Sequence, residues 1–229
     1  MPSRGRRPRA RRTNRRRMNR DSAIVHAPPI VRYTPNVFGF PDRLETRLRY
    51  CDYHNLTSTS GSLAKIVYRW NSTFDPNQSG VGHQPLYRDI YAGIYDQYAV
   101  IDAYVKVTIV NPGTVSTLVG LITDDDSTTS TTFQTLMEQS HGTSAELGPV
   151  SSSKSEIVLS KRWLASEILN IDPYTDSTYK TAVGSDPTEG SIFTVWAIPV
   201  DGSSTNQLNV TIELIQKVLW TELSTPTQS

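Results

Sequence analysis

An all-β sandwich of antiparallel strands is the fold class that this sequence predicts, and two patterns support it. In several segments apolar and polar residues alternate with period two, as in strands that have one buried and one solvated face. The clearest segment is 98–110 (YAVIDAYVKVTIV), where every odd position from 99 to 109 is apolar. Glycine, proline, asparagine and aspartate separate these segments, as turn-forming residues do.

In chain order, the expected strands are residues 43–53, 62–70, 98–110, 115–123, 154–162, 178–183, 191–200 and 207–220. The turn sequence Asn111-Pro112-Gly113 separates the third strand from the fourth. Short helices are expected at 86–95, 132–139 and 163–169 within the long connections. Eight strands with such connections favour an eight-stranded antiparallel jelly roll over an immunoglobulin-like sandwich, whose loops are usually shorter.

The N-terminal segment is a basic arm that cannot fold alone. It contains no acid and no lysine, and ten of its first twenty residues are arginine: Arg4, Arg6, Arg7, Arg9, Arg11, Arg12, Arg15, Arg16, Arg17 and Arg20. Guanidinium groups stay charged and bind phosphate bidentately, so the arm predicts a nucleic-acid partner. A nuclear localisation signal is the alternative interpretation, and both rest on the same exposed charge.

Charge divides the chain into an arginine-rich arm at 1–20, a linker at 21–42 and one domain at 43–229. Removing the ten arginines of the arm from 23 basic residues leaves 13, against all 22 acidic residues, so residues 21–229 carry a net charge of −9. Such a body repels nucleic acid on average, and we expect most of the binding free energy to come from the arm. Ten phosphate contacts to a single strand predict a log–log salt slope of roughly −7.

Several functional classes lack support in the sequence. No apolar run approaches the roughly 20 residues of a membrane span, so no membrane insertion is expected. The single cysteine, Cys51, excludes an intrachain disulfide and is interpreted as a buried structural thiol. No nucleophile motif or phosphate-binding loop is present, and we expect neither an enzyme nor a cofactor.

The connection 71–97 is rich in turn residues, and six of them are interpreted as a structural loop: Asp75, Pro76, Gly82, His83, Gln84 and Pro85. His83 is expected to anchor the loop, with a pH-sensitive contact or a metal ligand as alternatives, although the other histidines show no ligand spacing. Tyr87, Tyr91, Tyr95 and Tyr98 follow at helix-like spacing. Core and subunit packing is the interpretation for these tyrosines, with base stacking as the alternative.

The same region resembles the capsid proteins of small circular single-stranded DNA viruses that encode a rolling-circle replication protein. The resemblance rests on Tyr68, Asn71, Asp75, Pro76, Gly80, Gly82, His83, Gln84, Pro85, Tyr95, Tyr98 and Val100. It implies a single jelly roll whose arginine-rich arm faces the genome. Where that family often has Phe-Asp-Gln-Trp after the Gly-His-Gln-Pro step, this chain has the sequence YRDIY at 87–91.

The expected function is therefore a self-assembling icosahedral capsid subunit that packages single-stranded DNA, with about 60 copies in the simplest shell. Its expected location is the virion and, during infection, the host nucleus, where the arm is compatible with nuclear import receptors. Two alternatives stay open: the capsid of a satellite-type RNA virus, and a cellular jelly-roll module that binds nucleic acid through a basic tail.

Strand alternation also predicts a basic wall on the body. In the first strand Leu44, Leu48 and Tyr50 point into the core, and the opposite side carries Arg43, Arg47 and Arg49. The same argument leaves Lys106 and Lys217 outside the core. The resemblance to viral capsids implies that these three strands share the sheet nearest the lumen, so all five basic residues are expected to bind nucleic acid.

Three consecutive aspartates, Asp124, Asp125 and Asp126, follow the fourth expected strand. Hard oxygen ligands at a subunit junction make them a weak calcium candidate. The favoured interpretation is a solvated acidic turn, because adjacent residues at a strand end point to opposite faces.

Overall fold

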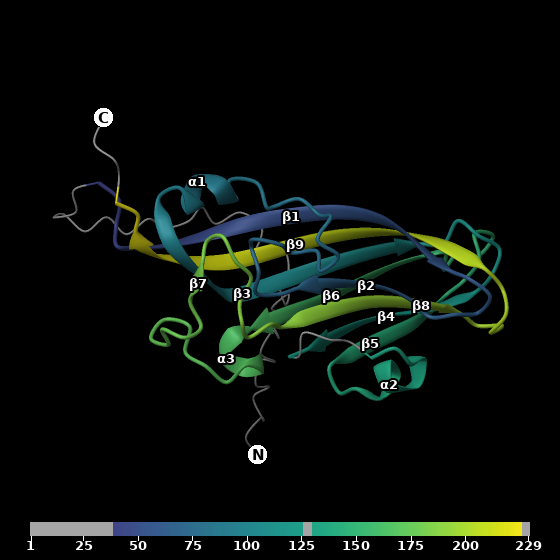
Figure 1. The fold of residues 1–229 in the computed structure, drawn as a ribbon. Coiled ribbons are helices and arrows are strands. Elements are labelled where there is room, and N and C mark those ends of the chain that lie inside the picture. The colour runs from purple at the N-terminus through teal and green to yellow at the C-terminus, as the bar shows by residue number, and fades with distance from the viewer. Residues whose placement is uncertain (1–38, 126–129, 226–229) are drawn as a thin grey trace, which may run out of the picture. The chain divides into compact units, whose positions relative to one another are not determined.

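The computed structural model describes residues 39–125 and 130–225. In this part of the chain, two antiparallel sheets pack face to face (Figure 1). The first sheet has the order β1 (Arg43–Ser58), β9 (Asn206–Leu223), β3 (Tyr95–Val110) and β6 (Glu156–Leu164), with the short β7 (Thr181–Ala182) beside β3. The second sheet has the order β2 (Ala64–Arg69), β8 (Ile192–Pro199), β4 (Thr117–Asp124) and β5 (Gly142–Leu147).

The strand order is that of a jelly roll. The chain passes repeatedly between the two sheets, and the last strand, β9, lies between β1 and β3. Figure 1 shows β1 and β9 running side by side, although they come from opposite ends of the described chain. This double Greek-key arrangement confirms the fold class that the alternation predicts.

Three short helices lie in the predicted connections, and each is shorter than expected. They are α1 (Arg88–Ala92), α2 (Phe133–Glu138) and α3 (Ala165–Ile168). No helix in the described ranges is long and apolar enough to cross a membrane.

The core fills the space between the sheets with the inward side chains that the alternation predicts. Leu48 and Tyr50 of β1, Val105 of β3 and Ile212 of β9 are all buried. Four tryptophans are buried as well, and two of them, Trp70 and Trp163, stack with their ring centroids 6.4 Å apart. Buried indole N–H groups need acceptors: Trp163 donates to Ser191 Oγ and Trp220 donates to Thr46 Oγ1.

A second, smaller apolar cluster lies on the outward face of the second sheet. Trp196 of β8 points away from the main core and packs with Ile122 of β4 and Leu136 of α2. Gly120 makes room for the indole, because a Cβ atom there would lie 2.4 Å from the Trp196 ring. The helix α2 therefore covers this face of the sandwich.

One expected connection and one expected strand differ from the structure. The segment 124–153 was expected to be a connection, but it contains β5. Only Leu147 of that strand is buried, so the apolar alternation that marks a strand is missing there. The expected strand at 178–183 shortens to the two residues of β7.

Two side chains point to the opposite side from the one predicted. Strict alternation over 98–110 would put Tyr98 on the outer face of β3 with the other even positions, but it is fully buried, because a bulge between Val100 and Asp102 shifts the register. Cys51 was interpreted as buried, but its side chain is exposed. It shares the outward parity of Arg49, and the alternation of β1 could have shown this.

Candidate nucleic-acid interface

The five predicted basic residues of the body lie together on the outward face of the β1-β9-β3-β6 sheet. We call this surface, made of the outward residues of those four strands, the open face. Arg43, Arg47, Arg49 and Lys106 are exposed, and Lys217 is about half-buried. Arg47 lies directly opposite Lys217 in the β1–β9 ladder. The structure thus places these five side chains outward, as the alternation predicts, whereas nucleic-acid binding by them stays a prediction.

Acidic residues share the open face with these cations. By parity it carries the cations Arg43, Arg47, Arg49, Lys106, Arg162 and Lys217 and the acids Glu45, Asp102, Glu156 and Glu213. Arg49 Nη2 lies 2.8 Å from Glu213 Oε1, and Arg162 donates to both carboxylate oxygens of Asp102 at 3.0 and 2.8 Å. The open face is therefore only weakly positive, rather than uniformly basic.

Arg162 was missing from the predicted site. It lies on β6 directly opposite Tyr104 of β3. Its expected strand, 154–162, had been identified, but its parity had not been worked out. Counting back from Arg162 by twos through Ser160 and Val158 would have placed all three on the open face, because the buried Leu159 lies on the other side.

Pairing divides the cations of the open face into two groups. Arg49, Arg162 and Lys217 each form an ion pair. Arg43, Arg47 and Lys106 form none with any described residue. Guanidinium and ammonium groups that are not already neutralised are the ones available to phosphate oxygens. Arg43 and Arg47 lie on β1, an edge strand of the sheet, and Lys106 lies on β3.

Glu45, Lys217 and Tyr174 form a cluster of polar contacts on the open face. Lys217 Nζ lies 2.7 Å from Glu45 Oε2, and the Tyr174 hydroxyl donates to Glu45 Oε1 at 2.8 Å. Burial opposes the charge of Glu45, but the hydrogen bonds from Lys217 and Tyr174 outweigh it and hold the pKa of Glu45 below its ordinary value. Burial likewise opposes the charge of Lys217, yet the same contacts raise its pKa. Both groups are thus charged at neutral pH.

The predicted structural loop is held by its own residues. Gln84 Nε2 donates to Phe74 O at 3.0 Å, and Arg69 donates to the Asp75 carboxylate at 3.2 Å. Arg88 N–H donates to Pro85 O at 3.1 Å where α1 begins. Gly82 is closely approached, because a Cβ there would lie 2.8 Å from Asn77 Cβ. These contacts fit the structural interpretation of the loop.

His83 anchors the loop to β1. Its ring stacks on Tyr50 at 4.5 Å, and its two nitrogens lie 2.9 Å from Gln84 O and 2.9 Å from Cys51 O. Because a neutral imidazole has only one N–H, donation to both carbonyls requires the protonated ring. The hydrogen bonds to Gln84 and Cys51 accordingly raise the pKa of His83. The contacts fit the anchoring interpretation of His83, and a pH-sensitive contact stays a prediction.

A polar network lies beneath the loop. The Asp52 carboxylate accepts from the hydroxyls of Tyr50 at 2.8 Å and Tyr68 at 2.9 Å, and it lies 3.0 Å from His54 Nε2. Burial opposes the charge on Asp52, but these hydrogen bonds outweigh it and lower its pKa. Both tyrosines have raised pKa values, chiefly because burial disfavours the phenolate. The network joins β1 and β2 and satisfies its own polar groups.

The tyrosines at helix-like spacing are divided between two elements. Tyr95 and Tyr98 belong to β3 and are fully buried. Tyr91 stacks on Trp220 with ring centroids 5.3 Å apart. Tyr87 is exposed and has a φ of 69°, in the left-handed region. Core packing therefore holds for three of the four.

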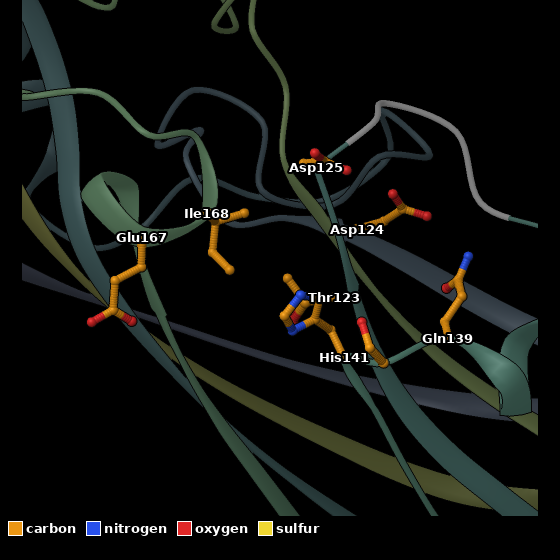
Figure 2. A pocket seen from close by; sticks show the side chains of 8 residues that line it. Thr123, Asp124, Asp125, Gln139, His141, Glu167 and Ile168 are labelled. Carbon is orange, nitrogen blue, oxygen red and sulfur yellow. The ribbon is translucent and has the colours of Figure 1, made fainter.

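A pocket of about 320 Å³ lies between the end of β4 and α3. Figure 2 shows Asp124 and Asp125 on one side, Glu167 and Ile168 across from them, and His141 between. Within the described ranges, no group of three or more His, Cys, Asp or Glu side chains could hold a metal ion. Asp126 lies outside the described residues, as do Arg4–Arg20 of the arm, so the calcium hypothesis stays a prediction.

Comparison with known proteins adds a likeness of architecture. No family model and no curated protein matches the chain. Its structure is similar to that of Desmodium yellow mottle tymovirus, with 15% identity and a TM-score of 0.45 over 86% of this chain and 97% of the other. It is also similar to the structure of mud crab tombus-like virus, with 10% identity and a TM-score of 0.48 over 87% of this chain and 98% of the other. A third similar structure is that of cocksfoot mottle virus, with 13% identity and a TM-score of 0.48 over 80% of this chain and 97% of the other.

Proposed function

We propose that this chain is the capsid subunit of a small virus, and that it assembles with copies of itself into a closed shell around a single-stranded genome. The observation that carries the proposal is the joining of two parts with opposite charge: ten arginines within the first twenty residues, and a jelly-roll body of net charge −9. Jelly rolls occur in capsids, lectins and cupins. Of these, the capsid class gives a reason for a polycationic arm, because the arm neutralises a packaged polyanion.

The kind of genome has two candidates. DNA follows from the sequence resemblance to capsids of circular single-stranded DNA viruses. RNA follows from the architecture, since the viruses with similar structures named above are RNA viruses. Of the two kinds of genome, RNA is the better supported. Nuclear import through the arm is expected only if the genome is DNA, and it stays a prediction.

The test is to express the full chain, image it by negative-stain microscopy and extract its nucleic acid. We expect uniform closed particles whose contents are degraded by one nuclease only, either DNase or RNase, after the shell is opened. A cellular binding module would bind nucleic acid without forming closed particles, and that result would overturn the capsid proposal.

Deleting residues 2–20 isolates the role of the arm. The deletion removes no strand of the jelly roll, so the thermal midpoint of the body should be unchanged. The packaged nucleic acid, measured from the ratio of absorbance at 260 and 280 nm, should fall to a small fraction. Normal packaging by the truncated chain would show that the arm is not the packaging element.

A further inference from the structure

Two tyrosines project from the open face, in addition to its charges. Tyr53 of β1 is 57% exposed and Tyr104 of β3 is 41% exposed. Both share the outward parity of the cations described above. A large aromatic ring on a sheet face normally packs on a neighbour or on a second layer. These two rings have no ring partner among the described residues, and each presents a substantial part of its surface to solvent.

Three cations lie near Tyr104: Arg162 and Arg49 are ion-paired with Asp102 and Glu213, whereas Lys106 forms no ion pair with a described residue. Arg162 lies directly opposite it on β6, and Lys106 is two residues further along β3 on the same face. On the other side, Ile215 of β9 separates Tyr104 from Arg49 of β1 in the same cross-strand row. With adjacent strands about 4.8 Å apart, all three cations lie within about 10 Å of the Tyr104 backbone.

Tyr87 provides the contrast. It is even more exposed, at 63%, but its exposed apolar neighbours are Leu86, which precedes it, and Ile90 of α1, and the adjacent Arg88 is buried and pairs with Asp89. No exposed cation accompanies that ring on its helix. The two sites thus share an exposed phenol and differ in the charge beside it. Sites that stack single-stranded bases combine an aromatic ring with positive charge along the backbone path.

We propose that Tyr104 is a base-stacking platform for single-stranded nucleic acid, with Tyr53 as a second platform on the same face. The proposal rests on the proposed packaging function and assigns it a specific contact. An unpaired base stacks on the phenol ring, while the phosphates on either side reach Lys106 and Arg47, two of the three open-face cations without an ion pair to a described residue. Duplex nucleic acid keeps its bases stacked internally and cannot use the rings. The site therefore selects single strands regardless of base identity.

The experiment compares two labelled oligonucleotides of equal length and charge, oligothymidylate and an abasic strand, binding to the full chain. Contacts between the arm and phosphates favour both strands equally, so any difference between them reports base contacts. The comparison is repeated at rising salt, because screening weakens phosphate contacts and leaves stacking largely intact. We expect the wild-type chain to prefer oligothymidylate by about tenfold.

Three variants assign that preference to the Tyr104 ring. Tyr104→Leu should reduce it severalfold, to the part that Tyr53 supports, because an apolar side chain without a ring cannot stack. Tyr104→Phe should retain it, because the ring remains and only the hydroxyl is lost. Tyr87→Leu is the matched control and should behave as wild type. The thermal midpoint of each variant checks that the jelly roll is intact.

Each contrary result has its own meaning. Equal binding of both strands by the wild-type chain, or an unchanged preference in Tyr104→Leu, overturns the platform and leaves the packaging function standing. Failure of either strand to bind at low salt overturns the packaging function itself. If Tyr104→Leu instead prevents particle assembly without altering base preference, the open face is a contact between copies, and the platform is overturned.

Discussion

The outward faces of the two sheets differ: one is covered and largely apolar, and the other is exposed and largely polar. On the second sheet, Thr194, Trp196 and Ile198 of β8 point outward beneath a layer formed by α2, and the indole of Trp196 is only 1% exposed. On the first sheet many outward positions are charged, and residues such as Arg49 and Lys106 are exposed. A sheet face must be either covered or polar. The first sheet is polar, so it is the one with a surface free for a ligand.

The difference also separates stability from function. Side chains of the covered face contribute to folding through burial, since each apolar group removed from water stabilises the folded state. Charges on the open face contribute little to folding, because exposed ion pairs are weak. Substitutions on the two faces should therefore affect different measurements.

Trp196→Ala should have the largest effect on stability. It removes a buried indole and leaves a cavity between β8 and α2, so the free energy of unfolding in urea should fall by about 3–5 kcal/mol. Tyr104→Ala on the open face is the control and should cost roughly 1 kcal/mol or less. Equal losses for the two variants would show that the cover of α2 does not stabilise the second sheet, and the contrast between the faces would fail.

Removing cations from the open face should alter binding rather than folding. In the triple variant Arg43→Gln, Arg47→Gln, Lys106→Gln, three unpaired cations are lost, and the log–log salt slope for single-stranded oligonucleotide binding should decrease by roughly two. The free energy of unfolding should change by about 0.5 kcal/mol or less.

A matched triple variant removes the paired cations instead: Arg49→Gln, Arg162→Gln and Lys217→Gln. It changes the net charge equally, but these side chains are already neutralised, so the salt slope should decrease less. Stability should decrease more, because Glu213, Asp102 and Glu45 lose their partners. If both triple variants change the slope equally, net charge alone governs binding and the pairing is irrelevant to it.

The sequence predicted side-chain parity well, because parity is local. The alternation of Leu48 and Tyr50 with Arg47 and Arg49 is enough to assign both sides of β1. Parity cannot reveal cross-strand partners. Arg49 pairs with Glu213 because β1 and β9, which are far apart in the sequence, are paired in one specific register. That register depends on the whole sandwich, and so does the charge balance of the open face.

Local patterns also failed where the backbone is irregular. The bulge after Val100 reverses the parity of β3, and nothing in the alternating segment 98–110 marks it. The strand β5 lies at the edge of its sheet and buries Leu147 alone, so it shows no apolar face to detect. The site was thus predictable where strands are regular and half-buried, and unpredictable where pairing or irregularity decides.

Glu45→Gln offers the finest test of the open face, because Glu45 neutralises one of its cations. The pKa of Glu45 is below its unfolded value of 4.5, so its contribution to stability is present above that value and is lost as the pH falls through the folded value. Wild type should exceed Glu45→Gln in unfolding free energy by about 1 kcal/mol or less at neutral pH, since the pair is partly exposed. The difference should vanish in acid.

Glu45→Gln should strengthen nucleic-acid binding although it weakens stability. Without Glu45, Lys217 becomes a fourth unpaired cation on the open face, so at neutral pH the salt slope should increase by roughly 0.7. Glu156→Gln is the control: it removes an equal charge from the same face, but Glu156 forms no ion pair with a described residue, so its removal frees no cation. If both variants steepen the slope equally, the general field of the face decides binding. If only Glu45→Gln does, Lys217 itself contacts the strand once its partner is removed.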